Sequence, residues 1–335
     1  MPEWNPRISA ILTAYNEAAH LREAIISVLN QTRPLDEILV VDDGSVDATP
    51  DIALSFEKDG VQLLRQLNQG PGAARNNGLS RTTGDLIAFL DGDDAWLPDK
   101  TQNQLDLFLS QPSLDLVSGD KIWWQMDDPS KRYIMSYGRP AMPQLRREIV
   151  FSICVGIPSM VLVRRSIFDR VGPWDPDIRW CEDWELWMRI AAEGQIGFVE
   201  KPVTLYRWHD RNMSHQNIWA RHRTLHGLSA REIGRRVPLW RRPFAYLRAF
   251  SRAEFARAQT TIDYDRKRHL RNAATALVTY PFDEFGGKAK ELARAVVGIE
   301  QSAAIAKRLR QPGRAANGLK GDVADWIDGH RPQSG

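Results

Sequence analysis

The sequence predicts an α/β fold with a mostly parallel central sheet, followed by a C-terminal helical extension. Over the first hundred residues, short apolar runs rich in β-branched side chains alternate with amphipathic segments of helical length. This alternation is typical of βαβ units. From about residue 215 onward, helical composition replaces it, with breaks at Pro238, Pro243, Pro281 and Gly286.

The expected elements follow one another closely in the first 110 residues. The strands are placed at Ile8–Thr13, Glu37–Val41, Val61–Arg65 and Leu86–Leu90. The helices are placed at Ala19–Asn30, Asp47–Phe56, Pro71–Leu79 and Pro98–Ser110. Ligands of such sheets bind beyond the carboxyl ends of the strands. The polar segments at those ends are therefore the candidates for a functional site.

Two domains are expected. Residues 1–214 form the α/β domain, whose aromatic-rich part after residue 110 is typical of a region that receives a second substrate. Residues 215–335 form a basic, mainly helical extension, with helical composition clearest at Arg248–Gln259 and Lys288–Arg310.

The formal net charge of +3 hides an uneven distribution, because residues 201–335 hold 26 Lys and Arg against 12 Asp and Glu. Residues 1–200 are therefore acidic. Aromatic side chains lie among the basic ones of residues 211–271: Trp219, Trp240, Phe244, Tyr246 and Phe250. This combination favours peripheral contact with an anionic membrane, although a solvated face of packed helices is the plain alternative. Nucleic acid is disfavoured, because no motif for binding it is present.

The sequence also disfavours several classes of protein. Cys154 and Cys181 stand outside any short-spaced Cys/His set, which disfavours a zinc site or a disulfide framework. No apolar run reaches the roughly 18 residues of a spanning helix, and the first residues lack the features of a secretory signal. We expect a cytoplasmic protein. Any contact with the membrane would be peripheral, at its inner face.

A carboxylate cluster directly follows the apolar run Ile87–Leu90. Asp91, Asp93 and Asp94 are too close together to ionise freely unless a cation lies among them. Oxygen ligands on a short turn suit Mg²⁺ or Mn²⁺. The alternative is a solvated Asp/Gly turn that caps the next helix.

Other strand ends also carry polar groups. Asp42 ends the second strand, where a carboxylate can accept hydrogen bonds from a base or a ribose, although turn and capping chemistry explains it equally well. Tyr15 follows the first strand and can stack on a base, and Arg75 follows the third and can bind base oxygens or phosphate. The glycines around Arg75 match neither a dinucleotide-binding nor a P-loop pattern, which disfavours a dehydrogenase or an ATPase.

A further candidate begins a helix. Asp183, Leu186, Trp187 and Ile190 have the spacing of one helical face, so we expect Asp183 on an inward, apolar stripe. Burial against tryptophan raises the pKa of a carboxyl and makes it a candidate general base. The alternative is a carboxylate stabilised by the helix dipole.

The ordered set of segments resembles the family 2 glycosyltransferases of the GT-A fold, which is Rossmann-like. The segments are TAYNEAAHLREAIISVLNQT, VVDDGSVDAT, GPGAARNNGL, GDLIAFLDGDDAW and EDWELWMRI, and the resemblance covers roughly residues 7–214. It implies that Asp91 and Asp93 bind the metal and the donor diphosphate, with Asp93 as the direct ligand. It also implies that Asp183 deprotonates the acceptor hydroxyl.

The resemblance extends to the nucleotide pocket and to a closing segment. It assigns nucleotide-sugar binding to Thr13, Tyr15, Glu17, Asp42, Arg75, Asp91, Glu182 and Arg207. His209, in the segment Tyr206–His209, would contact the metal or a phosphate. The QxxRW motif of processive polysaccharide synthases is absent from the sequence, which favours transfer of a single sugar.

The implied function is a metal-dependent, inverting transfer of one sugar from a nucleotide-diphosphate sugar to a glycan or lipid-linked acceptor, in the biosynthesis of cell-surface glycans. Mn²⁺ or Mg²⁺ is the expected cofactor. Two alternatives remain open. One is a sugar-1-phosphate nucleotidyltransferase, whose triphosphate loop is not visible near the N-terminus. The other is a carbohydrate- or nucleotide-binding module without turnover.

Overall fold

The computed structural model describes residues 4–128, 131–137, 139–151, 153–209, 211–213, 218–261 and 274–276. The expected helix at Lys288–Arg310 lies outside these residues. The chain forms two compact units. Of the described residues, the first unit contains 4–146 and 153–212, and the second contains 147–151 and those from 213 onward.

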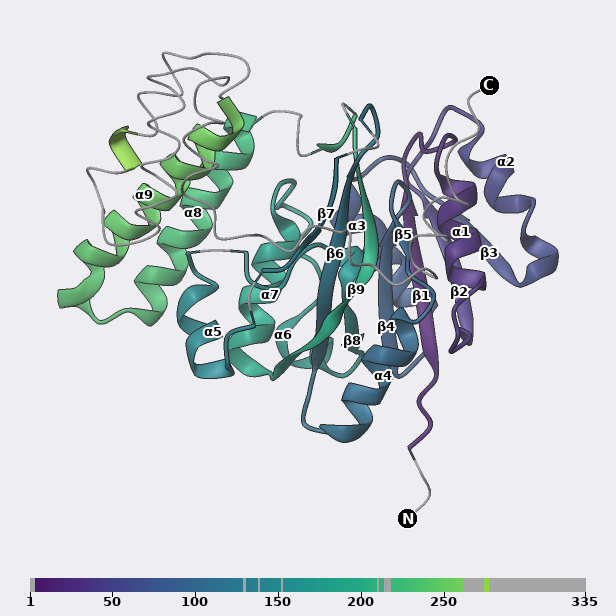
Figure 1. Cartoon of the computed structure of the whole chain (residues 1–335), viewed down its shortest axis with the longest axis horizontal. Coiled ribbons are helices and arrows are strands. Elements are labelled where there is room, and N and C mark those ends of the chain that lie inside the picture. Colours follow the sequence, from purple (N-terminus) through teal and green to yellow (C-terminus); the bar gives the residue numbers. More distant parts are fainter. Residues whose placement is uncertain are drawn as a thin grey trace. The chain divides into compact units, whose positions relative to one another are not determined.

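The first unit is built on one mixed sheet with the strand order β3-β2-β1-β4-β8-β6-β9-β5, and β7 pairs with β6 (Figure 1). The strands are β1 (Ile8–Ala14), β2 (Glu37–Asp42), β3 (Val61–Arg65), β4 (Leu86–Asp91), β5 (Ala95–Trp96), β6 (Leu116–Gln125), β7 (Arg132–Met135), β8 (Leu162–Arg164) and β9 (Ile196–Trp208). Strands β1 to β4 are mutually parallel. Strand β8 is antiparallel to both β4 and β6, so β6 and its parallel partner β9 run in the same direction as β4. The predicted α/β class with a mostly parallel sheet is confirmed.

The helices of the first unit connect these strands. They are α1 (Leu21–Leu29), α2 (Thr49–Leu54), α3 (Pro71–Arg81), α4 (Lys100–Ser110), α5 (Met142–Glu148), α6 (Ile167–Val171) and α7 (Glu182–Glu193), with short 3₁₀ turns η1 (Glu57–Asp59) and η2 (Pro158–Met160). Each strand and helix predicted in the first 110 residues is present, with ends within two residues of the expected positions. The second unit contains α8 (Ile218–Arg236), η4 (Leu239–Arg241) and α9 (Arg242–Thr261).

The core forms on both faces of the parallel strands, and every residue of β1 is buried. On one face, apolar side chains of β1 pack with those of α1, including Leu12 and Ile25. On the other face, α3 approaches so closely that a Cβ at Gly78 would lie 2.5 Å from Cγ2 of Ile11. A side chain at residue 78 would therefore push α3, and Arg75 with it, away from the sheet.

The register of the parallel strands brings their carboxyl ends to one edge. Ala14 is the Cα partner of Asp42, and Thr13 is the partner of Asp91. The loops that follow β1, β2 and β4 therefore begin side by side, as expected for a ligand site of an open α/β sheet. Asp42, Thr13 and Asp91 are brought to this edge by strand pairing alone.

Candidate functional site

Asp42 is fully buried where β2 ends. Its carboxylate accepts hydrogen bonds from the backbone N–H of Ser45 at 3.0 Å and from Nε of Arg65 at 2.8 Å. These bonds hold the turn after β2 and give the carboxylate an ionic partner. Asp42 lies at the predicted edge of the sheet, with part of its acceptor capacity already engaged.

The neighbouring Asp43 is a structural residue that the sequence did not distinguish from Asp42. It accepts from the backbone N–H groups of Gln69 at 2.9 Å and Gly70 at 2.8 Å. Gly70 has a positive φ of 90° and directly precedes α3, so Asp43 fixes the start of the helix that carries Arg75. Both aspartates lie in one DDGS segment, and only the long-range contacts separate their roles.

Arg75 joins two parts of the site that are far apart in the chain. Its guanidinium is almost completely buried and donates to Oδ1 of Asp91 at 2.7 Å and to Oε1 of Glu182 at 2.8 Å. Asp91 ends β4, and Glu182 begins α7. The bridge therefore ties the carboxylate cluster to the helix that carries Asp183. The terminal nitrogens of Arg75 are engaged within the protein rather than turned to an open pocket.

Trp174 supports this bridge, and no sequence motif pointed to it. The guanidinium carbon of Arg75 lies 4.7 Å from the centre of the Trp174 ring, a cation–π contact. Trp174 is held by a reciprocal pair of hydrogen bonds with the side chain of Asn76, at 2.8 and 2.9 Å. Asn76 follows Arg75 directly, so the two hydrogen bonds fix Trp174 against α3 beside the arginine.

The other carboxylate of the predicted pair, Asp93, lies near the end of β9. Its Oδ2 accepts a hydrogen bond from Asn212 at 2.9 Å and lies 3.4 Å from Nε2 of His209. The fully buried Arg207 donates to the carbonyl of Asp93 at 2.9 Å and pairs with Glu23 of α1. Arg207 thus holds the turn that carries Asp93, whereas His209 lies beside its carboxylate.

Asp94 has a different environment from its neighbours. It is fully buried and accepts from Oγ of Ser159 at 2.6 Å and from the backbone N–H of Arg207 at 3.3 Å. Burial, together with the charges of Asp93 and Asp91, raises the pKa of Asp94 well above its usual value. Ser159 Oγ also accepts from the backbone N–H of Asp91 at 3.1 Å, so it links the two ends of the cluster.

Glu17 lies on the loop after β1, where its backbone N–H donates to Thr49 at 2.8 Å. Burial raises the pKa of Glu17 to about 8, and the negative charges of Asp93, Asp47 and Asp91 add to this effect. The carboxyl of Glu17 is therefore held in its neutral form chiefly by burial, with a smaller contribution from the nearby aspartates. Tyr15, on the same loop, has a half-exposed ring.

Helix α7 places Glu182 and Asp183 in its first turn. Cys181 precedes the helix with a positive φ of 58°, so the chain turns sharply into it. Leu186, Trp187 and Ile190 are buried as predicted, while Asp183 keeps partial exposure. Asp183 Oδ1 accepts from the backbone N–H of the next residue at 2.7 Å. The carboxylate is therefore at the margin of the apolar stripe and in reach of solvent.

The residues near Asp91 and Asp93 fit a divalent cation in part. In the described chain, no group of three or more acidic, His or Cys side chains is arranged to hold a metal ion. Oδ2 of Asp91 and Oδ1 of Asp93 receive no hydrogen bond from the described residues, and the buried Nδ1 of His209 likewise lacks a partner among them. Two open carboxylate oxygens suit Mg²⁺ or Mn²⁺, which commonly take one or two carboxylates and complete their shell with phosphate and water.

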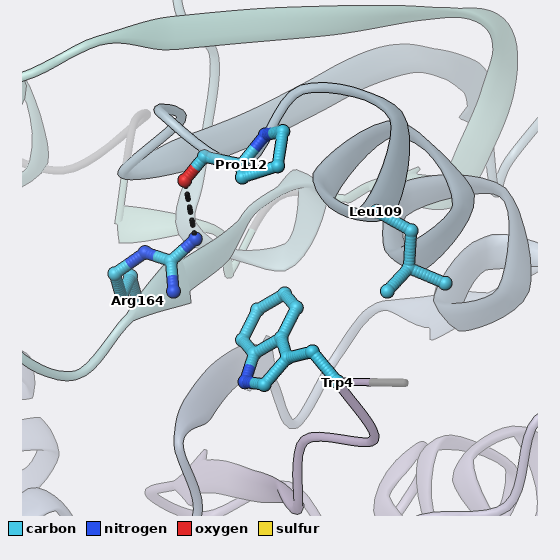
Figure 2. Close-up of a pocket in the computed structure, with 4 residues that line it drawn as sticks. All are labelled: Trp4, Leu109, Pro112 and Arg164. Carbon is cyan, nitrogen blue, oxygen red and sulfur yellow. Dashed lines mark hydrogen bonds between the residues drawn. The ribbon is translucent and has the colours of Figure 1, made fainter. Parts of the chain in front are cut away.

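A separate pocket of about 440 Å³ lies away from these residues and is lined by Trp4, Leu109, Pro112 and Arg164 (Figure 2). Arg164 is the Cα partner of Leu86, the first residue of β4, so this pocket lies at the amino end of the parallel strands. The Arg164 guanidinium donates to the carbonyl of Pro112 at 3.0 Å and lies 4.7 Å from the Trp4 ring. These contacts tie the N-terminal segment to the sheet, at the edge opposite the candidate site.

Comparisons with known sequences agree with this arrangement. The family model for glycosyl transferase family 2 matches residues 9–172. The putative teichuronic acid biosynthesis glycosyltransferase TuaG of Bacillus subtilis is 34% identical over 223 residues, which cover 65% of this chain and 85% of TuaG. An uncharacterized glycosyltransferase from a Nostoc species is 31% identical over 228 residues, 62% of this chain. The chain spans just under two thirds of that relative, 66% of its length.

Solved structures share the fold at low identity. The mannosyltransferase PcManGT from Pyrobaculum calidifontis, in complex with GDP-Man and Mn²⁺, has a TM-score of 0.58 and 19% identity, and covers 98% of this chain and 84% of its own. TarS from S. aureus, in complex with UDP-GlcNAc, has a TM-score of 0.55 and 16% identity over 86% of this chain and 91% of its own. The α/β fold of the first unit is thus shared with glycosyltransferases.

Replacing Glu17 should change how stability depends on pH in the absence of metal. The folded protein holds the Glu17 proton up to its pKa of about 8, whereas the unfolded chain releases it near the ordinary glutamate pKa of 4.5. This stabilisation is therefore complete below pH 4.5 and is lost as the pH rises to about 8. Relative to Glu17→Gln, we expect the wild type to lose roughly 2–4 kcal/mol of unfolding free energy over that interval, measured by urea denaturation. Parallel profiles for the two proteins would show that Glu17 is not the titrating group.

Replacing Arg75 should destabilise the fold. Lysine has a single terminal nitrogen on a flexible stem and cannot hold both Asp91 and Glu182 in the fork geometry of arginine. We expect Arg75→Lys to lower the free energy of unfolding by about 2–4 kcal/mol, since a buried carboxylate loses its partner. Arg65→Lys, at a half-exposed guanidinium, is the control and should cost less than about 1 kcal/mol. Equal losses in the two variants would refute the bridge.

Proposed function

The chain belongs to glycosyltransferase family 2, and on that premise we propose that it transfers one sugar from a nucleotide-diphosphate sugar to an acceptor hydroxyl. The observation that carries the proposal is the Arg75 bridge. The buried guanidinium joins Asp91 to Glu182. Asp91 lies at the edge of the sheet that we propose binds the donor, and Glu182 directly precedes Asp183. Sugar transfer requires the donor diphosphate and the attacking hydroxyl to be held close together.

The donor nucleotide is assigned to the loops after β1 and β2. The half-exposed ring of Tyr15 offers a face for stacking on the base. Asp42 is fully buried and bonded to Ser45 and Arg65, so its proposed role in nucleotide binding is to hold the turn after β2 that faces the base and ribose. Thr13, Arg75, Glu182 and Arg207 make their main contacts within the protein, so their proposed role is to hold the carboxylates that face the donor.

A divalent cation, Mn²⁺ or Mg²⁺, is proposed to bind at Asp91 and Asp93 with His209 beside them. When bound, such a cation neutralises the charge of the departing nucleoside diphosphate. Asp91 is fixed for this role by Arg75 and by Thr13, whose hydroxyl is 3.3 Å from Oδ1. Asp93 is fixed by Asn212, which leaves its Oδ1 available.

Asp183 is proposed as the general base. It removes the proton from the acceptor hydroxyl as that oxygen attacks the anomeric carbon, and one such displacement inverts the anomeric configuration. Its partial exposure at the first turn of α7 leaves the carboxylate accessible to an acceptor. The bond from the N–H of Trp184 holds it in place.

The acceptor is proposed to be a glycan or a lipid-linked glycan of the cell surface. The similarity to a putative teichuronic acid biosynthesis enzyme supports this class. A lipid-linked acceptor would also place the protein at the cytoplasmic face of a membrane. No helix in the described part of the chain is long and apolar enough to span a bilayer.

The first experiment is a screen of donors by thermal shift. UDP-, GDP- and dTDP-sugars are added with and without Mn²⁺, because a bound donor stabilises the folded state by mass action. We expect one nucleotide class to raise Tm and to be hydrolysed slowly in the absence of acceptor. Binding without hydrolysis or transfer would instead indicate a module without turnover.

Replacing Asp183 should separate donor binding from catalysis. Asp183→Asn keeps the shape of the side chain but removes the base, so we expect turnover to fall by at least about a hundredfold. The thermal shift produced by the donor should stay unchanged. Glu193→Gln, at the exposed end of the same helix, is the matched control and should retain activity. Full turnover by Asp183→Asn would refute the assignment.

Replacing Asp93 should weaken the binding of the metal on which donor binding depends. Asp93→Ala removes one of the two open carboxylates, so we expect the Mn²⁺ concentration for half-maximal donor stabilisation to rise by at least about tenfold. Asp59→Ala, on the exposed turn η1, serves as the control. The metal sites would be misassigned if Asp93→Ala and the wild type had the same Mn²⁺ requirement.

A further inference from the structure

The second unit exposes large apolar side chains where α8 is followed by α9. Four of them define what we call the apolar tip: Leu239 (75% exposed), Trp240 (69%), Phe244 (67%) and Leu247 (45%). They span nine residues, from η4 into the first turns of α9. Single exposed apolar residues are ordinary, but several gathered in one segment indicate a binding surface.

The apolar tip is not needed to hold the two helices together. Helix α9 returns antiparallel to α8, since the rings of His226 and Phe250 lie 5.7 Å apart and Arg242 donates to the carbonyl of Gly234 at 2.7 Å. The interior of the unit is formed by other side chains, among them the buried Leu228 and Ile233. The tip residues therefore remain available at the end of a helical hairpin, the α8–α9 pair seen in Figure 1.

Basic residues flank the tip in the sequence. The described residues 218–261 contain ten arginines and no lysine, against Glu232 and Glu254 as the only acidic residues. At the last turn of α8, Arg231, Arg235 and Arg236 lie within 3.5 Å of the single carboxylate of Glu232, which leaves this group of four with a formal charge of +2. One positive charge also adjoins the tip itself, because the guanidinium of Arg241 lies 4.4 Å from the Trp240 ring.

We propose that the apolar tip inserts into the interface of an anionic lipid bilayer, with the arginines of α8 and η4 at the level of the headgroups. Charge complementarity selects this occupant, since lipid phosphates match guanidinium groups and a bilayer surface also receives apolar side chains. Tryptophan and arginine prefer the boundary between headgroups and acyl chains. A nucleic acid would satisfy the charges but leave Leu239, Phe244 and Leu247 in water.

The proposed membrane binding is peripheral. Each basic residue near an anionic surface strengthens binding by roughly fivefold, and the effect is screened by salt. The buried apolar area adds a contribution that salt does not remove. The surface is independent of the proposed catalytic residues, so membrane binding and sugar transfer can fail separately.

The test uses the full chain in a vesicle flotation assay. Phosphatidylcholine vesicles are compared with vesicles that contain about one third phosphatidylglycerol, at low and at high salt. We expect the wild type to bind only the anionic vesicles, and to bind them less well at high salt. The double variant Trp240→Ser/Phe244→Ser should lower the partition coefficient by at least about tenfold. Arg235→Gln/Arg241→Gln should lower it and reduce its dependence on salt.

The controls distinguish a membrane surface from a protein interface. Leu54→Ser, at a half-exposed position on α2 of the first unit, should leave vesicle binding unchanged. Donor-induced thermal shifts should be equal in all variants, because none of them alters the donor site. Equal binding of the wild type to neutral and anionic vesicles, or equal binding by wild type and Trp240→Ser/Phe244→Ser, would overturn the proposal. So would sedimentation in the absence of lipid that shows a dimer lost in that double variant.

Discussion

A buried guanidinium that bridges two carboxylates is the interaction on which the candidate site depends. Arg75 holds Asp91 and Glu182 in a region with little water, where an unpaired charge is costly. The three groups therefore stabilise one another only together. Because Asp91 belongs to the sheet and Glu182 to α7, the pairing also sets the distance between this edge of the sheet and the helix that carries Asp183. Trp174 and Gly78 complete this constraint by fixing where α3 and its arginine lie.

The same edge concentrates negative charge, and the protein distributes it unequally. Asp94 is buried and bonded to Ser159, and its pKa is raised, whereas Asp91 and Asp93 each keep one carboxylate oxygen without a donor from the described chain. Burial raises the pKa of Glu17, and the charges of Asp93, Asp47 and Asp91 raise it further. An anionic diphosphate would be repelled here unless positive charge accompanied it. This electrostatic conflict supports the proposal that a divalent cation binds at the site.

The second unit has a different design. Its helices pair through a few internal contacts, while the apolar tip and the side chains of Arg223, Arg235 and Arg241 are exposed. A soluble hairpin gains nothing in stability from exposed Trp240 and Phe244, so a surface of this kind indicates a partner. A catalytic unit that acts on a lipid-linked acceptor would benefit from membrane attachment, since it confines the search for acceptor to a surface.

Local patterns were sufficient to predict the elements of the first 110 residues, because hydrophobic periodicity and strand-end turns depend on neighbours in the chain. They also placed Asp42, Asp91 and Asp93 at one edge, since parallel strands align their carboxyl ends. Only the tertiary structure paired Arg75 with Glu182, 107 positions apart, and gave Asp43, Ser159 and Trp174 their supporting roles. Those contacts depend on how α3 and α7 pack against the sheet. Long-range packing of this kind leaves no periodic signal in a single sequence.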